Sequence, residues 1–166
     1  MAFDCNLYDY LFSMETFTMT NAYKYAIGYF LAFSLLLIVS GTMLFEQKIG
    51  FSVNQVTEYY LGNEENFTVA KTFTGVLKVI LPHLAAFGLI SMVLLHFLIF
   101  TKYKDTKQLK YLTILLFSSA FLEVFSPFFI LLGTEFFSYV KVASFIVLET
   151  LVLYISWLLF ISLMKK

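Results

Sequence analysis

Four stretches of this 166-residue chain are long and apolar, and they constrain its fold more than any other feature. They cover about 25–45, 73–101, 111–133 and 139–164. Each approaches or exceeds the roughly 20 apolar residues that a helix needs to cross the hydrocarbon core of a bilayer. Only helices and closed barrels satisfy their backbone groups in lipid, and these runs lack the alternation of barrel strands. We therefore predict an all-α integral membrane protein, a bundle of four transmembrane helices.

The charge content agrees with a membrane protein and excludes one class of partner. Charged residues make up 13% of the chain and hydrophobic residues 60%, whereas soluble domains are about 25% charged. The net charge is zero and no stripe of basic residues exists, so we expect no nucleic-acid binding. The only cysteine, Cys5, excludes a disulfide within one chain.

Lysines in the short connections predict the orientation in the membrane. The link 102–110 contains four lysines and the chain ends in Lys165-Lys166. The positive-inside rule places both on the cytoplasmic side. Both termini are then cytoplasmic, and the loop 46–72 is external and acidic on balance. A bacterial inner membrane is the expected location.

Residues 1–23 form a separate N-terminal segment ahead of a transmembrane domain of residues 24–166. The segment lacks the basic start of a signal peptide, so we expect it to be retained. Its apolar residues recur at steps of three and four. This spacing fits a helix that lies in the membrane interface, and a disordered segment is the alternative.

The two histidines of the chain, His83 and His96, both fall in the second apolar stretch. Ionisable groups at such depth are candidates for function by default. They lie about 20 Å apart along a helix and cannot bind the same iron. Two axial imidazoles approach a haem iron from opposite sides, so a second copy of the helix in a two-fold dimer is the simplest source of the other ligand. The alternatives are core histidines bonded to a hydroxyl or a backbone carbonyl, a proton relay, or ligands of another metal.

Glycines accompany the histidines at matching intervals. Gly28 and Gly41 lie as far apart in the first stretch as the histidines do in the second, and Gly41 belongs to the sequence Val39-Ser40-Gly41-Thr42. In the second stretch, Gly75-Val76-Leu77-Lys78 precedes the first histidine and Gly88 follows it. Close packing of helices through small residues is the alternative account of these glycines.

This pattern resembles the haem-binding half of the cytochrome b family over residues 25–101. The resemblance implies a homodimeric b-type cytochrome with two b haems, and quinol and an external redox protein as its electron partners. The cofactor-binding residues that it implies are Gly28, Gly41, Gly75, Lys78, His83, Gly88 and His96, with the two histidines as the metal ligands.

Three features depart from the family pattern. The histidines differ by about 140° around an ideal helix, whereas the family's spacing leaves about 40°. The arginine that binds a haem propionate is absent, which leaves Lys78, and the alternative for this lysine is snorkelling to the outer interface. The third and fourth stretches contain no histidine. The first two stretches correspond to half of the family's four-helix core, so two copies of the chain would have to form it.

Glu123 and Glu149 lie inside the third and fourth stretches. We expect both to be protonated and to face protein, because burial disfavours the charged form of a carboxyl. Each could join two helices by a hydrogen bond or serve a proton-transfer or quinone site. Two further function classes stay open on the sequence: a cofactor-free subunit or scaffold of a larger complex, and a small ion or proton transporter.

Overall fold

The computed structural model describes residues 21–104 and 106–164, and these residues form a helical protein. Nearly all of the predicted N-terminal segment 1–23 lies outside the described residues. In chain order, the helices are α2 (Asn21–Lys48), α3 (Val53–Leu61), α4 (Phe73–Leu98), α5 (Lys107–Leu131) and α6 (Phe136–Met164).

The four predicted spans are confirmed as helices, because α2, α4, α5 and α6 are each long and apolar enough to cross a membrane. The chain is thus an integral membrane protein, and the exposed apolar side chains of these four helices contact lipid. Six of the eight predicted boundaries shift by two to four residues, and two of these shifts have a local cause. Helix α4 ends at Leu98, since residues 99–104 form turns and a bend. Helix α5 begins early, because the side chain of Thr106 accepts a hydrogen bond from the backbone N–H of Leu109 at 3.2 Å.

The loop predicted to be external contains the short helix α3, which the sequence analysis did not predict. At its start, the side chain of Gln55 accepts a hydrogen bond from the backbone N–H of Ser52 at 3.2 Å. At its end, Gly62 adopts a φ of 81°, a conformation that favours glycine. Val56 and Tyr60 are buried, so α3 lies as a cap across one end of the bundle.

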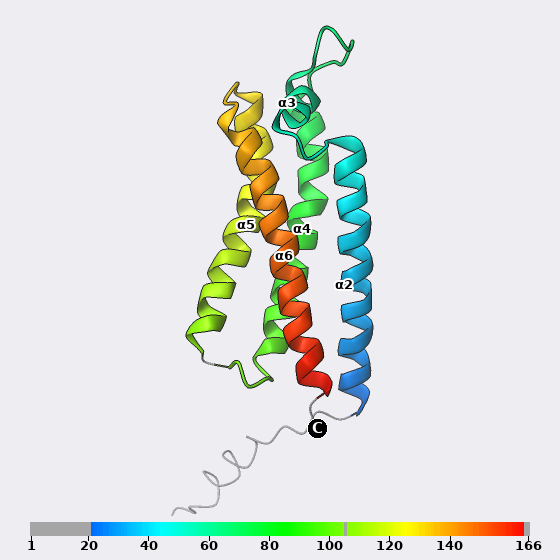
Figure 1. Ribbon diagram of the computed structural model, residues 1–166, viewed down its shortest axis with the longest axis vertical. Helices are drawn as coiled ribbons and strands as arrows, with labels where there is room; N and C mark the ends of the chain where they lie inside the picture. The colour runs from blue at the N-terminus through cyan, green and yellow to red at the C-terminus, as the bar shows by residue number, and fades with distance from the viewer. Residues whose placement is uncertain (1–20, 105, 165–166) are drawn as a thin grey trace, which may run out of the picture.

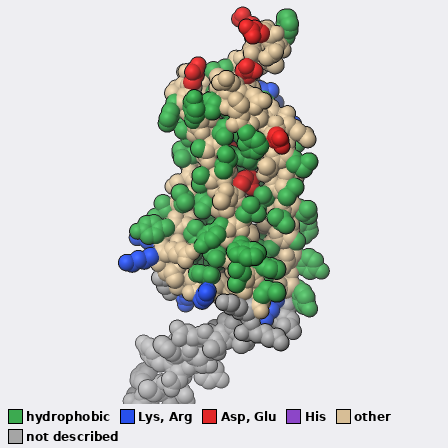
Figure 2. Space-filling view, in the orientation of Figure 1, with side chains coloured by type: hydrophobic (Ala, Val, Ile, Leu, Met, Phe, Trp, Pro, Cys, Tyr) green, Lys and Arg blue, Asp and Glu red, His purple; other side chains and the backbone are tan. Residues whose placement is uncertain are grey.

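The helices α4, α5 and α6 pack side by side, and α2 lies along α6 (Figure 1). We call the end that carries α3 the outer end and the opposite end the inner end. Both ends of the described chain lie at the inner end (Figure 1). Figure 2 shows most of the visible lysines at the inner end and acidic side chains mainly in the outer half. The structure therefore agrees that Asn21 and Met164 lie on one side, and the lysine count predicts that this side is cytoplasmic.

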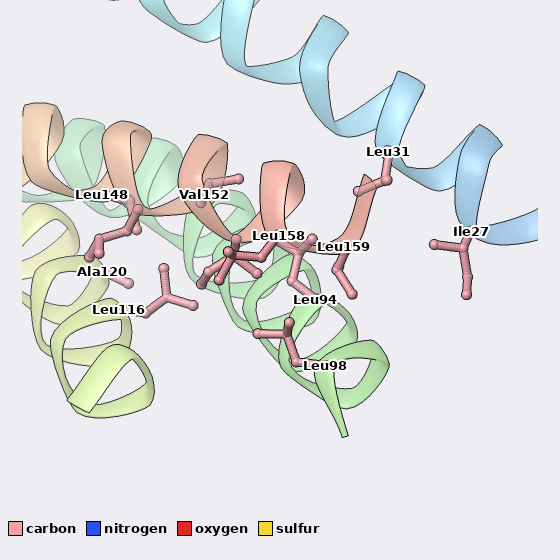
Figure 3. Close-up of a cluster of buried hydrophobic side chains, with 12 residues drawn as sticks. Ile27, Leu31, Leu94, Leu98, Leu116, Ala120, Leu148, Val152, Leu158 and Leu159 are labelled. Carbon is pink, nitrogen blue, oxygen red and sulfur yellow. The ribbon is translucent and has the colours of Figure 1, made fainter. Parts of the chain in front are cut away.

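Two clusters of buried apolar side chains hold the bundle together. The inner cluster joins α2, α4, α5 and α6, and Figure 3 shows its leucines meeting between the helices, with Leu31 and Ile27 reaching in from α2. The outer cluster joins α3, α4 and α5, and includes Val56, Val76 and Val124. Partly buried Phe87 packs against both clusters.

Candidate functional site

A layer of ionisable and hydroxyl side chains separates the inner cluster from the outer cluster. On α5, Glu123 stands between Ala120 of the inner cluster and Val124 of the outer cluster. We call this the polar layer; its members are His83 on α4, Glu123 on α5, and Lys141 and Ser144 on α6.

The centre of the polar layer is a buried ion pair. The Nζ of Lys141 contacts the Oε1 of Glu123, and the two side chains are only 8% and 6% exposed. The same Nζ donates to the backbone carbonyl of Glu123 at 2.8 Å. The Oγ of Ser144 donates to the Oε2 of Glu123 at 3.2 Å. Each carboxylate oxygen therefore has a donor, as a buried charge requires.

The contact with Lys141 confirms one expectation, that Glu123 faces protein. Its partner is a lysine, which the sequence did not predict, and the neutral state expected of its carboxyl stays a prediction. From the sequence alone, Lys141 lies near one end of the predicted fourth span and has no evident partner. Their depth could have indicated the pairing. Helices α5 and α6 are antiparallel, and Glu123 and Lys141 lie about 12 Å and about 8 Å from the turn that joins them.

Helix α3 covers the polar layer from the outer end. The hydroxyls of Thr57 on α3 and Ser138 on α6 are 2.8 Å apart and share a hydrogen bond. Tyr60 is buried beside them. Burial raises the pKa of the Tyr60 phenol above its ordinary value, and the negative charge of Glu123 adds to the rise. The Tyr60 side chain therefore stays neutral under the cap.

His83 lies on α4 at the depth of the ion pair, but its own chain leaves it exposed. Its Nδ1 is 2.6 Å from the backbone carbonyl oxygen of Val79. Phe87 contacts the ring edge to face at 5.7 Å. The imidazole also lies within electrostatic range of Glu123. His83 thus bonds to a backbone carbonyl, as one alternative predicted, without being part of the core.

His96 lies near the inner end of α4 and is also exposed. Its ring contacts Phe100 at 5.3 Å. The ring nitrogens form no hydrogen bond with any residue that the structure describes. Helix α4 is continuous between the histidines. Counted at about 100° per residue, His83 stands roughly 50° and His96 roughly 170° from the centre of the buried face of α4. The two histidines therefore face different directions.

The predicted glycines have unequal surroundings. A Cβ added at Gly28 or Gly88 would meet no atom within 4 Å. Gly41 is different, because its Cβ position lies 3.6 Å from the Oε1 of Glu149. Gly75 contacts only the capping side chain at the start of its own helix. Close helix packing within the chain thus explains neither Gly28 nor Gly88.

Lys78 and Glu149 complete the predicted residues. Lys78 is exposed and is turned about 140° from His83 around α4. This position suits snorkelling better than contact with a group bound at His83. Glu149 is half-buried against α2, and no hydrogen bond joins it to Glu123. Within residues 21–104 and 106–164, no three His, Cys, Asp or Glu side chains are grouped so that they could hold a metal ion.

Comparison with known proteins identifies one family. A family model described as a transmembrane helical domain, Aq_1264_TM, matches residues 50–166. The match contains helices α3 to α6 and with them the whole polar layer, and it leaves out α2. No curated protein and no solved structure matches the chain.

Proposed function

The chain belongs to this family of transmembrane helical domains, and for this membrane domain we propose an electron-transfer role. In the proposal it is a b-type cytochrome, and a homodimer binds haem b between histidines of its two copies. Quinol and a redox protein outside the membrane are the proposed electron partners.

One observation carries the proposal: both histidines of the chain lie on surfaces of α4 that its own helices leave uncovered. A polar ring at membrane depth requires a partner, a cavity or a cofactor. No side chain among the described residues forms a hydrogen bond with either imidazole. Within the described chain, His83 is bonded only to the backbone carbonyl of Val79, so we propose that a group from outside occupies the other side of its ring.

His83 has the arrangement that a haem ligand needs. Metal-binding histidines ordinarily donate one ring N–H to a carbonyl or carboxylate, which fixes the ring and leaves the other nitrogen for the metal. The contact between Nδ1 of His83 and the carbonyl of Val79 meets the first condition and leaves Nε2 free. Bound haem would supply one-electron redox chemistry at its iron, and the helices would set its ligands and its dielectric surroundings.

Only His83, and not both histidines, is the proposed haem ligand at the dimer interface. A stack of two haems in one interface requires both histidines to face the same neighbour. The uninterrupted helix α4 turns His96 away from that neighbour by about 140°. A haem at His96 would need a different partner, so the proposed dimer contains one haem, between the His83 side chains of its two copies.

The test is a haem count on protein purified from haem-replete cells. Reduced-minus-oxidised spectra and a pyridine haemochrome assay should give one haem b per two chains. His83→Ala should lose it and His96→Ala should retain it, with folding checked by circular dichroism and gel filtration. One haem per chain, with each variant losing half, would restore the two-haem arrangement. A colourless, folded preparation would overturn the proposal and favour a cofactor-free subunit.

A further inference from the structure

Glu149 lies at the centre of the longest membrane helix. It stands about 20 Å from Phe136 at the start of α6 and a similar distance from Met164 at its end. The residue is half-buried, so part of it faces away from the protein. An ionisable side chain at this depth is costly unless it serves a function or has a partner.

No other described residue forms a hydrogen bond or an ion pair with Glu149. The neighbouring hydroxyls are already used within their own helices. Each donates to a backbone carbonyl one turn earlier in its own helix. On α6, Thr150 donates to Ile146 at 2.7 Å. On α2, Thr42 donates to Ile38 at 2.9 Å and Ser40 to Leu37 at 3.1 Å. Glu149 therefore differs from Glu123, whose carboxylate oxygens each have a donor.

Gly41 leaves space for the carboxyl in the contact between α2 and α6. On the outer side of this position, the rings of Phe45 and Phe145 stack at 4.0 Å. On the inner side, Leu31 of α2 joins the inner cluster. Between these two contacts α2 presents a glycine to Glu149, with the Cβ position 3.6 Å from Oε1. The carboxyl thus packs against a glycine between two apolar contacts of α2.

The charges around Glu149 favour a neutral carboxyl at rest. Lys141, on α6 itself, is occupied by Glu123. Helix α2 presents uncharged Gly41 here and has its outer charges, Glu46 and Lys48, at its end. A charge on Glu149 would consequently meet no compensating cation within the described chain.

We propose that Glu149 is a proton-binding site inside the membrane, which exchanges its proton through the seam between α2 and α6. The ligand is the proton itself, and the site works whether or not the chain binds haem. The ion pair of Glu123 and Lys141 keeps the other membrane carboxylate occupied, so Glu149 is the exchanging group.

Dicyclohexylcarbodiimide, a lipid-soluble probe, tests this proposal directly. The protonated carboxyl transfers its proton to one carbodiimide nitrogen while its oxygen bonds to the central carbon. The acyl group then migrates to nitrogen and leaves a stable N-acylurea, with no atom lost. Mass spectrometry of the full chain in lipid nanodiscs should show one adduct, located at Glu149. Above the titration point, the labelling rate should fall about tenfold per pH unit, as the protonated fraction does.

Three variants make the result decisive. Glu149→Gln should abolish the adduct, and Glu123→Gln should keep it. Gly41→Leu should slow labelling severalfold at unchanged helix content, because its side chain fills the seam. An adduct on Glu123, or none on the folded chain at mildly acidic pH, would overturn the proposal. Protection by Na⁺ at constant pH would replace the proton with a metal cation, and unchanged labelling of Gly41→Leu would refute access through the seam.

Discussion

Removing Lys141 should destabilise the bundle far more than removing an exposed lysine. Lys141→Met leaves the Glu123 carboxyl buried without its partner, about 12 Å from the outer end of α5. Loss of one partner from a buried ion pair costs about 3–5 kcal/mol. We therefore expect a loss of that size in the free energy of unfolding.

The opposite substitution should cost less. In Glu123→Gln, the Lys141 ammonium keeps its hydrogen bond to the backbone carbonyl of residue 123, which is 2.8 Å long in the unsubstituted protein. It also stands only about 8 Å inside the start of α6, so its flexible stem can carry the charge toward the outer interface. The double variant should regain much of what Lys141→Met loses, because it buries no unpaired charge.

Unfolding by SDS in mixed micelles measures these differences. The fluorescence of Trp157, the only tryptophan, reports the transition, and circular dichroism follows the helices. Lys78→Met is the matched control, since Lys78 is exposed and its loss should change stability by about 0.5 kcal/mol or less. If Lys141→Met costs no more than this control, or if the two single losses add in the double variant, the reasoning from a buried ion pair is refuted.

Two further predictions concern the outer end and the topology. Because the raised pKa keeps a proton on folded Tyr60 that the unfolded chain releases near its ordinary pKa of about 10, stability should fall as pH rises above about 10. Tyr60→Phe should lessen this fall in SDS titrations, and an equal fall in both proteins would contradict the assignment. In a Cys5→Ser background, single cysteines at Asn63 and Lys107 should react with an impermeant maleimide from opposite sides of the membrane. Labelling from the same side would disprove the topology.

The long helices were predictable because the length of an apolar run is a local property of the sequence. Helix α3 was not, because a nine-residue helix is marginal by itself and depends on packing. Its buried residues, Val56 and Tyr60, contact helices that follow later in the chain. Spacing within α3 alone does not reveal that contact.

The candidate site was predictable residue by residue but not as a group. Depth alone singled out Glu123, Glu149 and the two histidines. The partner of Glu123 depended on the register between α5 and α6, which the turn at residues 132–135 sets. Helical periodicity predicts the 140° offset of His83 and His96, and α4 is continuous between them. Their exposure depends instead on which faces of α4 the other helices cover.

Helix α2 decides whether the chain crosses the membrane an odd or an even number of times. The family-matched part contains three membrane-spanning helices, α4, α5 and α6, and an odd number of crossings leaves the two ends of a unit on opposite sides. Helix α2 adds a fourth crossing while sharing only the edge of the core through residues such as Ile27 and Leu31. Its addition turns an odd number of crossings into an even one, and brings Asn21 to the same side of the membrane as the end of α6.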